Sequence, residues 1–154
     1  MRRGVRSNDR TTPTWPTTIN MEQDKDLKKI IQESTFNVVN GDFVYAKVKS
    51  VPKKHDFFML SIDQDEITVV TQNFQGLSLI EKNRDVYALI ALNVSIPFYS
   101  VGFLAAISKA LAEKGTNILI ISTYSKDYVM VKKEKLPGAR KVLKSLGLKL
   151  ILSH

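Results

Sequence analysis

The sequence predicts an α+β fold whose C-terminal half forms one unit of four strands and two helices. Four apolar runs have the length of buried strands, and two segments with helical spacing of apolar residues stand between them. In chain order the six segments are residues 86–94 (strand), 101–114 (helix), 117–123 (strand), 127–132 (strand), 137–146 (helix) and 149–152 (strand). The order strand, helix, strand, strand, helix, strand is that of the split βαβ, or ferredoxin-like, fold.

Both expected helices carry an apolar stripe and end at a glycine. The stripes consist of Val101, Leu104, Ile107 and Leu111 in the first helix and of Ala139, Val142, Leu143 and Leu146 in the second. Gly115 and Gly147 follow the last helical positions, where glycine commonly ends a helix. Pro137 suits a first helical turn, because the N–H that it lacks has no partner there. Each stripe is therefore expected to face the sheet.

The first half of the chain predicts a truncated, mostly β unit without full helices. Residues 1–35 are expected to form a disordered basic tail with a short helix at 24–33. Residues 36–82 are expected to form the truncated unit with its connector, and residues 83–154 the ferredoxin-like unit. The strands expected in the truncated unit are 36–39, 42–49, 57–62 and 67–71.

Two turns of the truncated unit have distinctive sequences. Asn40-Gly41 stands between apolar runs and predicts a two-residue hairpin, because both residues tolerate positive φ. Asp63, Asp65 and Glu66 form an acidic turn between the next two strands. A calcium loop would need a glycine and a distant glutamate at fixed offsets, and neither is present. We therefore interpret this acidic segment as a hairpin turn.

The composition excludes several kinds of chemistry. The chain has no cysteine, which excludes disulfides, cysteine nucleophiles and thiolate metal sites. Its two histidines, His55 and His154, lack the partners that metal or triad chemistry needs. No apolar run approaches the roughly 20 residues of a membrane-spanning helix. We expect a cytoplasmic, non-catalytic protein with no cofactor and no membrane partner.

The net charge is strongly positive. The chain has 23 Lys and Arg against 15 Asp and Glu, for a formal charge of +8. Much of the excess lies in the first ten residues and around the last helix. A solvated tail and a solvated helix face explain this distribution better than a nucleic-acid site. Non-specific binding of polyanions at low salt is left open.

Two polar patches are candidate binding sites. The loop 95–102 leads from a strand into a helix, where free backbone N–H groups suit a carboxylate or phosphate. On spacing alone, an ordinary helix start with Ser100 as cap and Gly102 for packing is the preferred interpretation. In the second patch, Ser122, Thr123 and Asp127 place a carboxylate beside hydroxyls, which could hold an ammonium group or simply solubilise a hairpin.

Several strings in the C-terminal unit resemble the ACT-domain superfamily. They are Gly102-Phe103-Leu104-Ala105-Ala106, Leu111-Ala112-Glu113-Lys114-Gly115, Ile120-Ile121-Ser122-Thr123-Tyr124 and Asp127-Tyr128-Val129-Met130-Val131. The chain is most similar to small two-ACT proteins, which are related to the aspartate-kinase regulatory domain and to cytosolic arginine sensors. It departs from their pattern at Met130 and at Thr116-Asn117. The resemblance covers residues 36–152 and is strong from 86 to 135.

The resemblance implies a regulatory or sensory module that binds an amino acid at an interface between two ACT units. Partners implied by the family are the small-molecule ligand and either a second copy of the chain or a regulated enzyme. By position, Ile96, Ser100, Val101 and Gly102 would hold the ligand carboxylate. Ser122, Thr123 and Asp127 would lie near its amino group or side chain.

Three alternatives remain at this point. An RNA-binding module has the same element order and would stack bases on Tyr87 and Tyr128 of the two central strands, although its usual aromatic signature is missing. Nucleic acid is therefore not the expected partner. A pure protein-interaction domain with a vestigial pocket is the second alternative. An acylphosphatase-like enzyme is disfavoured, because the loop before the first helix has no arginine.

Overall fold

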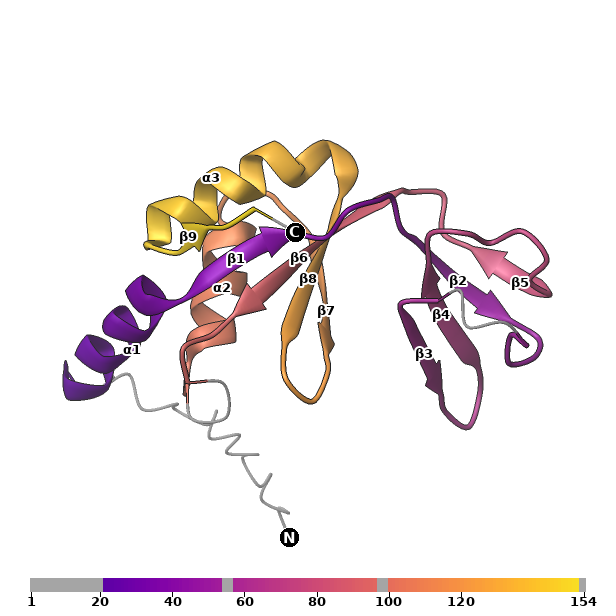
Figure 1. Cartoon of the computed structure of the whole chain (residues 1–154), viewed down its shortest axis with the longest axis horizontal. Coiled ribbons are helices and arrows are strands. Elements are labelled where there is room, and N and C mark those ends of the chain that lie inside the picture. The colour runs from indigo at the N-terminus through magenta and orange to yellow at the C-terminus, as the bar shows by residue number, and fades with distance from the viewer. Residues whose placement is uncertain (1–20, 54–56, 97–99, 153–154) are drawn as a thin grey trace, which may run out of the picture.

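A computed structural model describes residues 21–53, 57–96 and 100–152 (Figure 1). The expected tail at 1–20 and both histidines lie outside the described residues. The helices are α1 (Met21–Glu33), α2 (Phe103–Ala112) and α3 (Leu136–Leu146), and a short 3₁₀ helix, η2 (Lys133–Lys135), precedes α3. The strands are β1 (Thr35–Val38), β2 (Val44–Val48), β3 (Met59–Ile62), β4 (Ile67–Thr71), β5 (Leu79–Lys82), β6 (Tyr87–Asn93), β7 (Ile118–Ser122), β8 (Asp127–Lys132) and β9 (Lys149–Leu150).

The first sheet has five strands in the order β7-β8-β6-β1-β9. All three helices cover one of its faces, and their apolar stripes form one core with the strands (Figure 1). The buried helical residues of this core are Ile31, Phe103, Ile107, Leu111, Ala139, Val142 and Leu143. The elements β6, α2, β7, β8, α3 and β9 follow one another as the sequence predicts. The ferredoxin-like α+β class is therefore confirmed.

Strand β1 lies between β6 and β9 in this sheet. It pairs antiparallel with β6 along its whole length and parallel with β9 on its other side. The hairpin expected at Asn40-Gly41 is therefore wrong, since β1 does not pair with β2. The physical reason is that Phe36, with no exposed surface, packs into the core under the helices. Gly41 still adopts a positive φ of 103°, but the turn leads the chain from one sheet into the other.

The second sheet has four strands in the order β3-β4-β2-β5. Read in chain order, its strands occupy the positions of the four strands of a ferredoxin-like sheet, and residues 72–78 form a loop where the second helix of that fold would stand. The truncated, mostly β unit is thus present. Strand β5 lies in the connector expected at the end of residues 36–82. Its only apolar residues are Leu79 and Ile80, so no apolar run indicated a strand there. As an edge strand it pairs only with β2, and Ile80 is 54% exposed. The division of the chain at residues 35 and 82 stays a prediction.

The second sheet packs on the face of the first sheet away from the helices, over β6, β7 and β8. Phe43 and Val70 of the second unit share one buried cluster with Leu89 and Met130 of the first sheet. The Phe58 ring meets the Tyr128 ring edge-on at a centroid distance of 4.8 Å. Two connections between the sheets run side by side, and their backbones exchange hydrogen bonds of 2.9 and 2.8 Å between residues 43 and 87. The two sheets therefore share a core.

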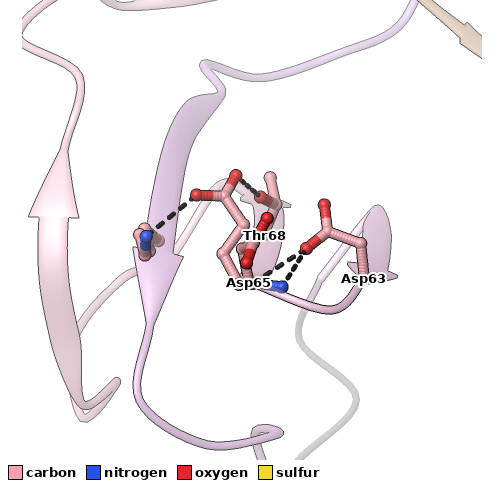
Figure 2. A network of polar contacts seen from close by, with 5 residues as sticks. Asp63, Asp65 and Thr68 are labelled. Carbon is pink, nitrogen blue, oxygen red and sulfur yellow. Dashed lines mark hydrogen bonds and ion pairs between the residues drawn. The ribbon is translucent and has the colours of Figure 1, made fainter.

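The acidic turn between β3 and β4 is a hairpin turn, as the sequence predicts (Figure 2). The Asp63 carboxylate accepts the backbone N–H groups of Asp65 and Glu66, both at 2.8 Å, and these bonds lower the pKa of Asp63. Glu66 accepts the Thr68 hydroxyl and pairs with Lys47 at 3.0 Å, which raises the pKa of Lys47. In the described part of the chain, no three His, Cys, Asp or Glu side chains gather closely enough to hold a metal ion.

The burial of Phe36 predicts that β1 contributes strongly to stability. Phe36→Ala should lower the free energy of unfolding by about 3–5 kcal/mol, because it removes a buried ring and leaves a cavity. Urea denaturation measures this loss. The control is Phe74→Ala, since Phe74 is 38% exposed, and its cost should stay below about 1 kcal/mol. Equal losses for the two variants would contradict the placement of β1 in the core.

Candidate ligand-binding site

The two polar patches lie at the same end of the first sheet. Ser122, the last residue of β7, is the register partner of Asp127, which begins β8. Asp127 is in turn the partner of Leu92, next to the end of β6 where the loop 94–102 begins. Adjacent strands are about 4.8 Å apart, so Ser122 lies roughly 10 Å from the end of β6. An amino acid can span much of that width.

Ser122 and Asp127 form a hydrogen-bonded pair. The Ser122 hydroxyl donates to Asp127 Oδ1 at 2.6 Å, so this bond orients the carboxylate. Asp127 lies on the same face of the sheet as Val129 and Val131, because side chains alternate along a strand. Those valines pack in the core beneath the helices. The carboxylate therefore lies on the helix side of the sheet, at the end where α2 begins.

The Thr123 side chain forms its hydrogen bonds within the β7–β8 turn. Its hydroxyl donates to the Lys126 carbonyl at 3.0 Å and accepts the Lys126 N–H at 3.3 Å. The Thr123 N–H also donates to the same carbonyl at 2.8 Å. These bonds close the β7–β8 turn and hold Ser122 and Asp127 opposite each other.

Helix α2 starts at Gly102, which has a left-handed φ of 84°. The expectation that Ser100 caps this helix is wrong, because no side-chain capping bond forms and the Ser100 hydroxyl donates to the Ile96 carbonyl instead. The Ser100 carbonyl accepts the Phe103 N–H at 3.1 Å. Val101 is 84% exposed, so the side chain turns away from the core. These loop residues therefore offer backbone groups rather than side chains to a ligand.

Helix α1 packs beside this loop, which the sequence did not indicate. Ser34 is fully buried, and its hydroxyl donates to the Ile30 carbonyl at 2.6 Å and accepts the Ser95 N–H at 3.1 Å. A Cβ atom placed on Gly102 would lie 3.4 Å from the Leu27 side chain. Ser34 and Leu27 are thus structural residues of the site. No local pattern could identify them, because Ser34 is 61 positions from Ser95 and Leu27 is 75 positions from Gly102.

Two cavities lie elsewhere in the molecule. One of about 490 Å³ lies in the second unit and is lined by residues 50–53, 57, 71, 73 and 75–78. The other, of about 370 Å³, lies near the start of β6 and is lined by residues 38–42, 88, 133 and 136. Neither contains any of the expected ligand residues. The candidate site is therefore distinct from both of these cavities.

Comparison with known proteins identifies the C-terminal unit. A profile of the ACT domain matches residues 83–145. This part of the chain belongs to the ACT-domain superfamily. The match begins just before β6 and ends in α3, so it contains both polar patches of the candidate site. The search of curated proteins gave no significant match.

Solved structures with the same fold extend the likeness beyond the ACT domain. A protein of unknown function from Vibrio cholerae, described as a possible transport protein, is 25% identical with a TM-score of 0.70, and the match covers 81% of this chain and 98% of that one. An Agrobacterium tumefaciens protein is 18% identical with a TM-score of 0.64, covering 79% and 94%. The regulatory subunit of aspartate kinase from Thermus thermophilus is 11% identical with a TM-score of 0.51, covering 72% and 95%.

No helix among the described residues is both long and apolar enough to cross a membrane.

We expect the Ser34 hydroxyl to stabilise the loop between β6 and α2, the first helix of the ACT domain. Ser34→Ala should cost about 1–2 kcal/mol, because it leaves the Ser95 N–H without its acceptor. The control is Ser145→Ala, whose hydroxyl donates only to the Val142 carbonyl within its own helix at 2.7 Å. That variant should change stability by less than about 0.5 kcal/mol. Chemical denaturation compares the two, and an equally small effect of Ser34→Ala would refute the role of this bond.

Proposed function

We propose that this protein is a non-catalytic regulatory module that binds an amino acid at the end of its ACT-domain sheet. The observation that carries the proposal is the carboxylate of Asp127, oriented by Ser122 at the sheet end where α2 begins. The ACT-domain match and the likeness to a regulatory subunit of aspartate kinase support a regulatory role. A shared fold hosts many functions, so the choice of ligand is argued from the site.

The proposed site has a negative and a positive end, as a zwitterion requires. The Asp127 carboxylate accepts hydrogen bonds from the ligand's ammonium group, or from a cationic side chain. The start of α2 provides backbone N–H groups and the positive end of the helix dipole for the ligand's carboxylate. In this proposal Ile96, Ser100, Val101 and Gly102 contribute backbone groups, Ser122 orients Asp127, and Thr123 holds the turn.

We propose that the complete site forms between two copies of the chain. Strand β7 is an edge strand of the first sheet, and it contains no charged residue, proline or register shift. Its Ile120 side chain is 41% exposed. Such an edge is a template for pairing with another strand. Antiparallel pairing of two β7 strands would bring the second copy next to Ser122, where it could close the open side of the ligand site.

The RNA alternative is not proposed on the sheet face. Tyr87 is only 7% exposed, and its burial raises the pKa of its phenol group. Tyr128 is covered by the Phe58 ring. Bases could not stack on these tyrosines without separating the two sheets.

A cytoplasmic location is part of the proposal, since a chain without cysteine suits a reducing compartment.

Ligand binding should stabilise the protein in a thermal-shift screen against the twenty amino acids. A ligand present at 100 times its Kd contributes about 2.7 kcal/mol, which corresponds to a rise in Tm of about 5–10 °C for a domain of this size. Asp127→Ala should abolish the rise, because the ammonium group loses its acceptor. Glu113→Ala, an exposed carboxylate on the turn after α2, should leave it intact.

No rise with any amino acid, or an undiminished rise in Asp127→Ala, would refute the proposed ligand site. A protein-interaction domain would then be the better description.

Pairing through β7 should make the protein a dimer in solution. Ile120→Lys should convert it to a monomer, because it places a charge in the centre of the paired edge. The matched control is Ile62→Lys at the edge strand β3, where Ile62 is 60% exposed. Light scattering coupled to size-exclusion chromatography measures the molar mass. A wild-type monomer at tens of micromolar, or a dimer that survives Ile120→Lys, would count against this interface.

A further inference from the structure

The outer face of α3 carries only positive charge. Three exposed cations lie on it: Arg140, Lys141 and Lys144. We call these three residues the cationic face. Residues 135–154 contain no Asp or Glu side chain that could neutralise it.

The lysines elsewhere that form ion pairs differ from those of the cationic face. Among the described residues, Lys47 pairs with Glu66, Lys132 with Asp85, Lys133 with Asp42 and Lys29 with Glu33. None of the ion pairs in this part of the chain includes a residue of the cationic face. From the sequence, these cations were interpreted as a solvated helix surface. The structure places them together, without an ion-pair partner among the described residues.

The cationic face is held on a rigid element. Residues 140, 141 and 144 fall within an arc of about 100° and a rise of about 6 Å on an α-helix. The opposite side of α3 is anchored in the core by Ala139, Val142 and Leu143, all buried. The exposed Lys149 of β9 lies on the other side of the sheet, because its neighbours Leu148 and Leu150 pack in the core under the helices. The three charges of α3 are therefore presented together on the solvent side of the helix layer.

The chemistry of the cationic face favours one class of partner. Protein interfaces are depleted in lysine and rely on aromatic anchors, and no large apolar side chain of α3 is exposed among the described residues. A membrane-binding helix needs apolar side chains that enter the bilayer, and the cationic face of α3 has none. A phosphodiester backbone requires only cations spaced along a surface.

We propose that the cationic face binds the phosphate backbone of nucleic acid without reading its sequence. The site is separate from the amino-acid site and from the covered sheet face, so it does not depend on the proposed regulatory function. All three cations contact phosphates. For a single strand the slope of log K against log salt concentration is then about −2, at about −0.7 per phosphate.

The test is fluorescence anisotropy of the full chain with a labelled poly-uridine strand of twenty nucleotides, between 25 and 200 mM KCl. The test variant is Arg140→Glu/Lys141→Glu/Lys144→Glu. The control is Lys25→Glu/Lys28→Glu/Lys29→Glu, which makes the same change of net charge on the exposed side of α1. The test variant should lose at least 10-fold in affinity at 25 mM KCl, and the control should lose less than 3-fold.

Each other outcome overturns the proposal. Equal losses in the two variants would show that only net charge matters, and a wild-type protein that does not bind would exclude the site. Two aliphatic residues, Ile151 and Leu152, follow β9 and are 44% and 84% exposed. Binding to phosphatidylserine vesicles but not to RNA, lost in Ile151→Ser/Leu152→Ser, would identify a membrane surface instead. The triple exchange to Gln repeats the test if the Glu variant has a lowered Tm.

Discussion

Strand β1 lies between β6 and β9, and its backbone hydrogen bonds to both join the N-terminal segment to the core of the first sheet. Phe36 fixes this position by burying its ring under the helices. Because α1 precedes β1 directly, the same pairing draws α1 onto the helix layer and sets Ser34 against the loop after β6. Because β2 follows, it also directs the chain into the second sheet.

The helices cover one face of the first sheet, and the second sheet packs on the other face over β6, β7 and β8. The β6–α2 loop begins, and the β7–β8 turn lies, at the same end of this sheet. This is a physical reason why the proposed ligand site lies there, and why a stacking site on the central tyrosines is closed. Edge strand β7 stays available for a second copy of the chain.

The proposed ligand site and the cationic face lie on different elements of the first unit. Asp127 and Ser122 lie on the strands nearest the β7 edge, whereas the cationic face lies on the solvent side of α3. A dimer formed through the β7 strands would pair sheet edges and would not use α3. Binding of a polyanion would not compete directly with a small ligand, and any coupling between them would have to pass through the shared core.

Local sequence patterns predicted the helices, their glycine ends, most of the strands and the order of elements in the C-terminal unit. They could do so because helices and strands each impose a characteristic spacing on nearby apolar residues. They also placed Ser122, Thr123 and Asp127 in one polar patch and indicated the ACT-domain family. Only the tertiary structure showed that β1 pairs with β6 rather than with β2 across the Asn40-Gly41 turn. The same is true of strand β5 and of the hydrogen bond from the β6–α2 loop to Ser34. These features join residues far apart in sequence. The burial of side chains such as Phe36 decides which distant strands pair, and the periodicity of neighbouring residues does not reveal it.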